Sequence, residues 1–158
     1  MPVYPQAKPF IPDDIARFLA QPLVAKLSTH NDDGTIHTVP IWFKYHEGEF
    51  LFGTQDVSRK IQNIRRDNRV TVLVETTDPN LKGIMVYGTA TLDYGDVIPK
   101  RRLVFEKYMP AEDAGALAER LAGMWKPVIV RVTPERMITF DYAQGFGVGA
   151  EGEGTKII

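Results

Sequence analysis

The segment Gly53–Asn63 contains the side chains best suited to binding an anion. An apolar strand pattern gives way to polar residues here, and a helical pattern then begins with Ser58, Arg59 and Lys60 in its first turn. The N-terminus of a helix offers unpaired backbone N–H groups and the positive end of the helix dipole. Two cations oppose that dipole at a small cost, which a bound anion removes. The pattern predicts a phosphate site, and the alternative is that Arg59 and Lys60 form only a solvated helix face.

Five cations lie between Arg59 and Arg69, with Asp67 as the opposing acid. Such a run is also found in nucleic-acid-binding proteins. This stretch lacks flanking aromatic residues for base stacking, and no second basic stripe matches it, because Lys100–Arg102 is typical of a solvated helix face. We therefore expect no nucleic-acid partner.

Other common chemistries lack their residues or their spacing. The chain has no cysteine, which excludes disulfides, thiolate nucleophiles and Cys-ligated metals. Its histidines are not spaced as metal ligands, and its serines are not in a nucleophile-elbow sequence, so we expect neither a metal site nor a hydrolase. These residues are His30, His37 and His46, and Ser28 and Ser58. Redox chemistry, if present, requires a borrowed organic cofactor.

Hydrophobic periodicity predicts the elements that position this segment. Short strands are expected at Leu23–Ser28, Thr35–Tyr45, Glu49–Thr54, Val70–Glu75, Gly83–Asp93, Val128–Val132 and Arg136–Phe140. Helices are expected from Pro12, over Ser58–Arg66, over Lys100–Met109 and over Ala111–Met124. Pro40 has no N–H and predicts an edge or a bulge in its strand. Many strands with inserted helices indicate a mainly β fold, an antiparallel barrel of six or seven strands with satellite helices. An open α+β sheet is the alternative.

Composition and charge describe an ordinary domain. The chain has 158 residues and a net charge of -1, so no overall field attracts nucleic acid or a membrane. No apolar run approaches the length of about 18 residues that a membrane span needs, and we expect a cytoplasmic protein without a membrane partner. One domain is expected over residues 1–144, followed by a Gly-rich C-terminal tail, 145–158. Gly145–Ala150 matches G-x-G-x-x-A, but no helix pattern follows, so the match does not predict a dinucleotide site.

The order of several short motifs carries a family resemblance. These are the Val-Pro-Ile-Trp sequence within Gly34–Trp42, the segment Phe50–Lys60, then Asn68–Val70 and Tyr87–Ala90. Over about Ala16–Tyr142 the chain resembles the pyridoxamine 5'-phosphate oxidase-like, FMN-binding split-barrel superfamily. The resemblance implies a homodimer with two cofactors in clefts between the subunits, and it implies that Gly145–Gly154 runs along the partner or the mouth of the cleft.

The resemblance also assigns roles to single residues. It implies that Val39, Pro40, Ile41 and Trp42 line the flavin ring, that Thr54 and Gln55 approach the ring or the ribityl chain, and that Ser58, Arg59 and Lys60 hold the phosphate. Asn63 belongs to the same cofactor-binding motif. Trp125 either covers the ring from the partner subunit or packs in the core. No residue stands out as catalytic.

Two departures separate the chain from true pyridoxamine phosphate oxidases. Thr38 and Phe43 stand where those enzymes have further basic residues, and Gly145–Ile158 lacks their Arg-rich substrate motif. The Lys60–Asp67 stretch looks more like the flavin/deazaflavin oxidoreductase branch. We therefore expect an oxidoreductase that transfers hydride between FMN and a small organic substrate. The alternatives are a coenzyme F420-dependent reductase and a non-catalytic carrier or sensor of FMN or haem.

Overall fold

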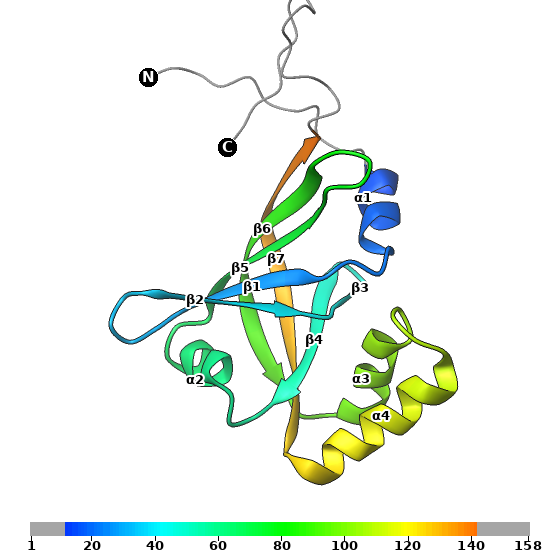
Figure 1. Cartoon of the computed structure of the whole chain (residues 1–158). Coiled ribbons are helices and arrows are strands. Elements are labelled where there is room, and N and C mark those ends of the chain that lie inside the picture. Colours follow the sequence, from blue (N-terminus) through cyan, green and yellow to red (C-terminus); the bar gives the residue numbers. More distant parts are fainter. Residues whose placement is uncertain (1–11, 142–158) are drawn as a thin grey trace, which may run out of the picture.

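The computed structural model describes residues 12–141, with side chains from Asp14 onward. It consists of one seven-stranded antiparallel sheet and four helices (Figure 1). The elements are α1 (Pro12–Leu19), β1 (Ala25–His30), β2 (Ile36–Ile41), β3 (Lys44–His46), β4 (Glu49–Gln55), α2 (Arg59–Arg66), β5 (Arg69–Thr76), β6 (Lys82–Asp93), α3 (Val97–Phe105), α4 (Ala111–Met124) and β7 (Pro127–Asp141). The predicted domain end at residue 144 and the tail 145–158 lie outside the described residues.

The sheet has the strand order β2-β1-β5-β6-β7-β4-β3 and curls into a half-barrel (Figure 1). All of its pairs are antiparallel, and β7 lies between β6 and β4, with Phe50 opposite Val132 and Gln55 opposite Pro127. The two terminal strands, β2 and β3, are not hydrogen-bonded to each other. The expected mainly β fold with satellite helices is therefore confirmed.

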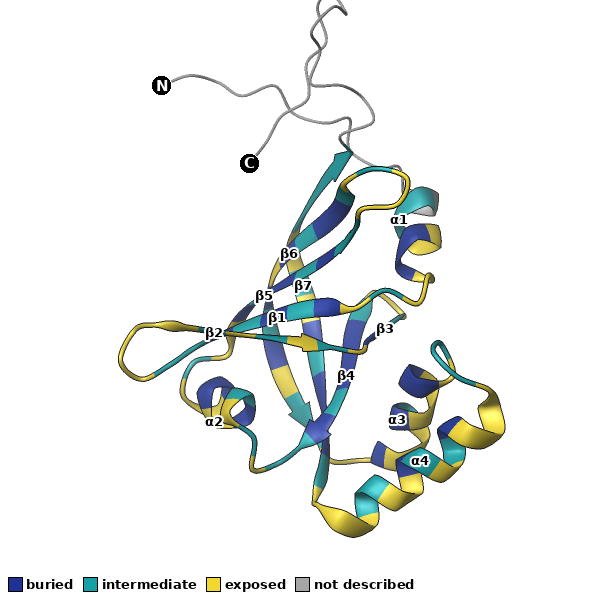
Figure 2. Cartoon of the chain, in the orientation of Figure 1, coloured by how far each residue is buried: buried dark blue, intermediate teal, exposed yellow. Residues whose placement is uncertain are grey.

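The core lies on the inner, concave face of the sheet. Alternate residues of β1 and β5 are buried, as the period of two of a strand dictates. The largest fully buried side chains there include Phe43, Phe50 and Phe52. Residues on α1 close one end of this core, where Phe18 and Leu19 are also buried. Figure 2 shows that exposed residues gather instead on α4 and on the turn between β1 and β2.

A second apolar cluster joins α3 and α4 to the other face of β4 and β7. Leu51 and Ile129 from the strands meet Val104 and Phe105 from α3 and Ala118 from α4. The two helices therefore lie on one side of β4 in Figure 1, and α2 lies on the other side.

Several predicted boundaries were wrong, among them the end of the helix expected at Met109, which lies at Phe105 in α3. The strand expected over Thr35–Tyr45 is divided into β2 and β3, because the backbone N–H of Phe43 is donated to the Tyr108 hydroxyl. The two strands expected after residue 127 are one continuous strand, β7, with an irregularity opposite Tyr87 and Gly88. Helix α3 starts at Val97 rather than Lys100, since proline is tolerated in a first helical turn.

Pro40 lies in β2, which among the described strands pairs only with β1 and is an edge strand, as its missing N–H predicted. Within residues 12–141, no helix is long and apolar enough to cross a membrane.

Candidate functional site

At the N-terminus of α2, several hydrogen-bond donors and two positive charges have no partner among the described residues. Ser58 is the N-cap residue in an extended conformation, but its hydroxyl makes no capping bond. Its Oγ is buried and has no hydrogen-bond partner. The backbone N–H groups of Arg59 and Lys60 have no acceptor among the described residues, and no acid lies in the first turn. These groups together can accept an anion at the positive end of the helix.

The five cations of this stretch divide into two groups. Arg65 pairs with Asp56, Arg66 donates to the His30 carbonyl and to Asn63 Oδ1, and Arg69 pairs with Asp67 at 2.7 Å. In contrast, Arg59 and Lys60 make no ion pair or hydrogen bond with a described side chain. Lys60 is half-buried, and this burial lowers its pKa. The structure thus leaves unpaired the two cations that lie in the first turn of α2.

A polar network holds the loop that leads into α2. Arg65 Nη2 donates to the Tyr94 hydroxyl at 2.8 Å, and Tyr94 in turn donates to Asp56. The hydrogen bond from Tyr94 is the main reason that the pKa of Asp56 is lowered. The backbone N–H of Asp56 donates to the carbonyl of Lys126 at 2.9 Å. This bond brings the end of α4 to the start of the candidate site.

Trp125, adjacent to Lys126, is the C-cap residue of α4 and is 43% exposed. This exposure argues against the alternative role in the core, and the expected role at the cofactor from the partner subunit stays a prediction. The backbone N–H of Trp125 donates to the Leu121 carbonyl, which fixes the main chain at this point.

The residues expected to line the ring come from edge strand β2. Val39 and Ile41 pack against the core with their side chains, while Pro40 is exposed on the opposite face. Their backbone groups lie at a strand edge that no described strand covers. Trp42 follows directly, 36% exposed, with its ring stacked on Tyr108 at 4.6 Å between centroids and edge-on to Phe105 at 5.8 Å.

Thr54 and Gln55 lie at the end of β4, which also has an open edge. β3 pairs with β4 only as far as Leu51, so beyond it β4 has β7 on one side and no described strand on the other. Thr54 is buried, and the Gln55 carbonyl accepts the N–H of Ser58 at 3.1 Å. The end of β4 and the start of α2 therefore form one continuous segment, as the sequence predicted.

Asn63 is fully buried on α2, and its amide is engaged within the protein. It donates to Thr29 Oγ1 at 3.0 Å and to Asn31 Oδ1 at 2.9 Å. Asn63 therefore fixes α2 to β1 and to the following turn, and the amide hydrogens are not available to a ligand in this arrangement.

Sequence analysis did not single out three residues near this region. Tyr108 donates to the Leu23 carbonyl at 2.6 Å and ties the end of β2 to the connection between α3 and α4. Lys107 lies over the Phe43 ring, and Arg101 is buried against β4 at Gly53, so the solvated face predicted for Lys100–Arg102 is wrong for Arg101. Their positions depend on how α3 packs, and no local pattern indicates this packing.

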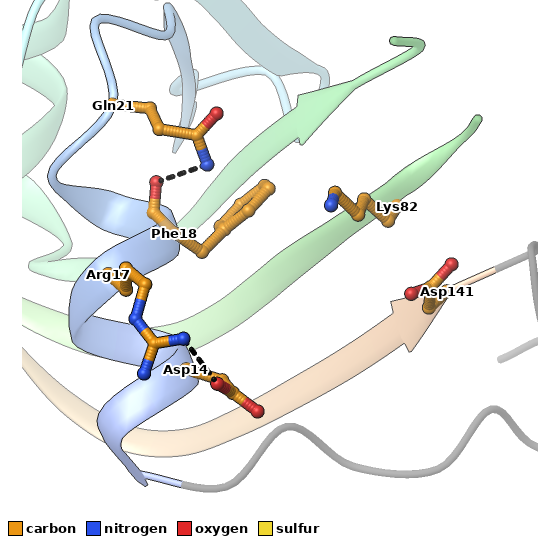
Figure 3. Close-up of a pocket in the computed structure, with 6 residues that line it drawn as sticks. All are labelled: Asp14, Arg17, Phe18, Gln21, Lys82 and Asp141. Carbon is orange, nitrogen blue, oxygen red and sulfur yellow. Dashed lines mark hydrogen bonds and ion pairs between the residues drawn. The ribbon is translucent and has the colours of Figure 1, made fainter. Parts of the chain in front are cut away.

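A pocket elsewhere in the molecule has a volume of about 250 Å³ (Figure 3). It lies between α1 and the ends of β6 and β7, and Figure 3 shows Arg17 paired with Asp14 at 3.3 Å on its wall. Two acids and two bases line it, so it has no excess of positive charge, and none of the predicted site residues belongs to it. In residues 12–141 no group of three His, Asp or Glu side chains could hold a metal ion.

Comparisons with solved structures agree with the split-barrel architecture. The conserved hypothetical protein Rv2991 from Mycobacterium tuberculosis is 26% identical, with a TM-score of 0.77 over 92% of this chain and 93% of that chain. An F420 reductase is 20% identical, with a TM-score of 0.64 over 80% of this chain and 98% of that one. The haem storage protein HutZ from Vibrio cholerae is 14% identical, with a TM-score of 0.63 over 81% and 94% of the two chains. The last two similarities show a common fold.

No match was found among curated proteins. The family model described as pyridoxamine 5'-phosphate oxidase matches residues 11–140, which span the whole sheet except the last residue of β7. The match includes β2, the end of β4 and the first turn of α2, whose geometry is described above. On this match, the chain belongs to the pyridoxamine 5'-phosphate oxidase family.

Proposed function

We propose that this protein is a cytoplasmic oxidoreductase that binds FMN without a covalent bond and uses it to oxidise or reduce a small organic substrate. The observation that carries the proposal is the first turn of α2. There a buried Ser58 hydroxyl without a partner, two free backbone N–H groups and two unpaired cations lie together. A buried polar atom without a partner is uncommon in proteins and needs an explanation.

A terminal phosphate fits this set of groups. The two positive charges of Arg59 and Lys60 match a phosphate charge near −2. The hydroxyl and the free N–H groups supply directional donors, and charge-assisted hydrogen bonds are about twice as strong as neutral ones. Bound phosphate would also return a charged partner to Lys60, whose burial now disfavours its ammonium.

Other residues of the chain then orient the rest of the cofactor. The open edges of β2 and of β4 beyond Leu51 present backbone groups to a planar ring, and Trp42 offers an aromatic face that is held by Tyr108. Trp125 directly precedes Lys126, whose carbonyl accepts the N–H of Asp56 in the loop before α2. When bound, a flavin supplies the hydride chemistry, while the protein binds, orients and shields it.

Coenzyme F420 is the alternative cofactor of the same site. It also has a phosphate, and the similarity in fold to an F420 reductase supports it. The choice between the two is made by direct titration of the purified protein with FMN and with F420, followed by absorbance and fluorescence.

The test of the phosphate site is the double variant Arg59→Ala/Lys60→Ala. We expect the dissociation constant of the preferred cofactor to rise about tenfold or more, because two charge-assisted contacts are lost. The matched control is Arg102→Ala/Arg120→Ala, which removes the same charge from the exposed surface of α3 and α4. An unchanged affinity in the first variant, or an equal loss in both, contradicts the phosphate assignment.

A second experiment separates the enzyme from a carrier or sensor. The loaded protein is reduced by light without oxygen and then mixed with a panel of organic acceptors. Rapid reoxidation by one of them supports the enzyme, whereas reoxidation by oxygen alone supports a carrier. A haem spectrum in the purified protein would contradict the flavin proposal.

A further inference from the structure

Arg101 is a buried cation without a partner. The residue lies on α3 and is 3% exposed. Its Nε and Nη1 atoms are buried and have no hydrogen-bond partner, and no described acid forms an ion pair with it. Its neighbours on α3 behave differently, since Lys100 pairs with Asp93 at 2.7 Å and Arg102 with Glu106 at 2.6 Å. Arg101 is therefore the one cation of α3 that the described chain leaves without an acceptor.

Burying such a group opposes folding. A guanidinium remains protonated in proteins, so Arg101 cannot avoid the cost by losing its proton, although burial lowers its pKa. A buried charge without a partner costs free energy that packing does not return. The Phe105 ring, whose centroid lies 5.6 Å from the guanidinium carbon, supplies only part of the missing interaction. A destabilising group of this kind is typical of a functional site.

The surroundings of Arg101 connect it to the candidate site. A Cβ atom on Gly53 would lie 2.8 Å from Arg101 Cγ and 3.2 Å from Nε, so the side chain fits only because residue 53 is glycine. Gly53 immediately precedes Thr54, on the part of β4 whose edge is open. Phe105, whose ring lies beside the guanidinium, is also edge-on to the Trp42 ring. The guanidinium thus lies against β4 one residue before Thr54, and over the ring of Phe105, which is a neighbour of Trp42.

We propose that Arg101 is a cofactor-binding residue whose guanidinium donates to an oxygen acceptor of the flavin or deazaflavin ring. This inference rests on the proposed function and extends it from the phosphate to the ring. A ring of this class gains negative charge when it is reduced, and a nearby positive charge favours the reduced form. Arg101 therefore binds the reduced cofactor more tightly than the oxidised one.

The test compares Arg101→Met with the wild type, using FMN and F420 as probes in their oxidised form and, without oxygen, in their reduced form. Arg102→Met is the matched control, because Arg102 is exposed on the same helix. We expect Arg101→Met to weaken binding of the reduced cofactor about tenfold more than binding of the oxidised cofactor. We expect Arg101→Lys, which keeps the charge, to recover part of this difference, and Arg102→Met to behave as the wild type.

A second readout is the stability of the protein without cofactor, measured by urea unfolding. Arg101→Met removes an unpaired buried charge, so the variant should be at least as stable as the wild type while it binds the reduced cofactor less tightly. A purely structural arginine would instead lower stability and leave the preference for the reduced cofactor unchanged.

Several results overturn the proposal. An unchanged ratio of the affinities for reduced and oxidised cofactor in Arg101→Met overturns it, whatever happens to stability. A change of oligomeric state in Arg101→Met also overturns it, because the missing acceptor would then belong to a second copy of the chain. If Arg101→Met does not fold, the ratio is read from Arg101→Lys, in which an unchanged value has the same meaning. When Arg59→Ala/Lys60→Ala loses the cofactor and the Arg101 variants do not, only this inference fails. A wild type that binds neither FMN nor F420 overturns both proposals.

Discussion

At the scale of single residues, Lys107 has the most altered proton affinity among the lysines described. Its Nζ donates to the Leu19 carbonyl at 2.9 Å and lies 3.3 Å from the centroid of the Phe43 ring. Both contacts favour the ammonium, but burial, helped by the charge of Lys44, outweighs them and lowers the pKa of Lys107 to about 7. Lys107 is therefore near half protonation at neutral pH.

This residue makes stability depend on pH. In the unfolded chain Lys107 titrates near its ordinary pKa of 10.5. Between that value and about 7, the unfolded chain holds a proton that the folded protein has released, so the free energy of unfolding rises with pH across this window. Below this window Lys107 is protonated in both states, so its burial lowers the free energy of unfolding by a constant amount. Urea unfolding from neutral pH to about 9.5 should show this rise in the wild type and not in Lys107→Met. Parallel profiles for the two proteins would contradict it.

At the scale of elements, the close pairing of β6 and β7 depends on Gly88. The register shifts between Tyr87 and Gly88, and a Cβ atom on Gly88 would lie 2.4 Å from the Thr133 carbonyl oxygen. This oxygen belongs to the backbone of a paired strand, so it cannot move aside as the end of a flexible side chain could. The close approach of these two strands therefore excludes any side chain at residue 88.

Gly88→Ala should lower the free energy of unfolding by about 2 kcal/mol or more, since the inserted methyl group must push two paired strands apart. The control is Gly123→Ala, where a Cβ atom meets nothing within 4 Å. That change lies in α4, where alanine is favoured over glycine by about 0.5–1 kcal/mol, so it should stabilise the protein. Urea denaturation of both variants gives opposite signs if this description holds.

The position of α2 depends on one buried amide. Asn63→Ala removes the hydrogen bonds to Thr29 and Asn31 and leaves their oxygens without this donor. The expected loss in free energy of unfolding is about 1–3 kcal/mol, the usual cost of an unsatisfied buried polar group. Gln62→Ala, which changes an exposed amide on the same helix, should cost much less. Equal effects in urea unfolding would show that Asn63 does not fix the helix.

At the scale of the whole molecule, the outer face of the sheet has the features of an interface. Leu73, Met85 and Ile138 lie opposite one another on adjacent strands and point away from the core. Tyr87, two residues after Met85 on the same face of β6, is 39% exposed. Adjacent apolar residues of this kind often form contacts between proteins. The family resemblance implies a homodimer, and we propose that this face joins its two copies.

Tyr87→Arg tests this arrangement by placing a second positive charge next to the apolar row, opposite Arg136 on β7. We expect sedimentation velocity to show a dimer for the wild type and a single chain for the variant, since a buried unpaired charge opposes association. Ile98→Arg is the control, because Ile98 is also 39% exposed but lies on α3. A wild-type protein that sediments as one chain contradicts the proposed dimer.

Local patterns were sufficient for much of the fold. The residues Ala111–Met124 form a helix over the range that was predicted, and Pro40 correctly indicated an edge strand. The first turn of α2 was also predicted, because capping and charge are local properties of Ser58–Lys60. Whether those groups bind phosphate is a prediction that the described residues do not test.

Tertiary packing determined what the patterns missed. The break after β2 depends on the hydroxyl of Tyr108, a distant residue that accepts the N–H of Phe43. Asp56, which pairs with Arg65, and the His30 carbonyl, which accepts from Arg66, lie outside α2, so the sequence could not show that Arg59 and Lys60 differ from the other cations of the stretch. In the sequence, Arg101 looks like a surface arginine within a basic run. Its burial results from the packing of α3 on Gly53.

The place of β7 between β6 and β4 has a consequence for synthesis on the ribosome. The strand β4 pairs with β3 over only three residues, and its main partner is the stretch of β7 from Pro127 to Val132. Until that stretch emerges, a nascent chain exposes one edge of β4 and the facing edge of β6, and exposed edges invite association with other chains. The half-barrel therefore cannot form before residues 127–132 have left the ribosome, and the loop that follows β4 gains its hydrogen bond to the Lys126 carbonyl only at about that point.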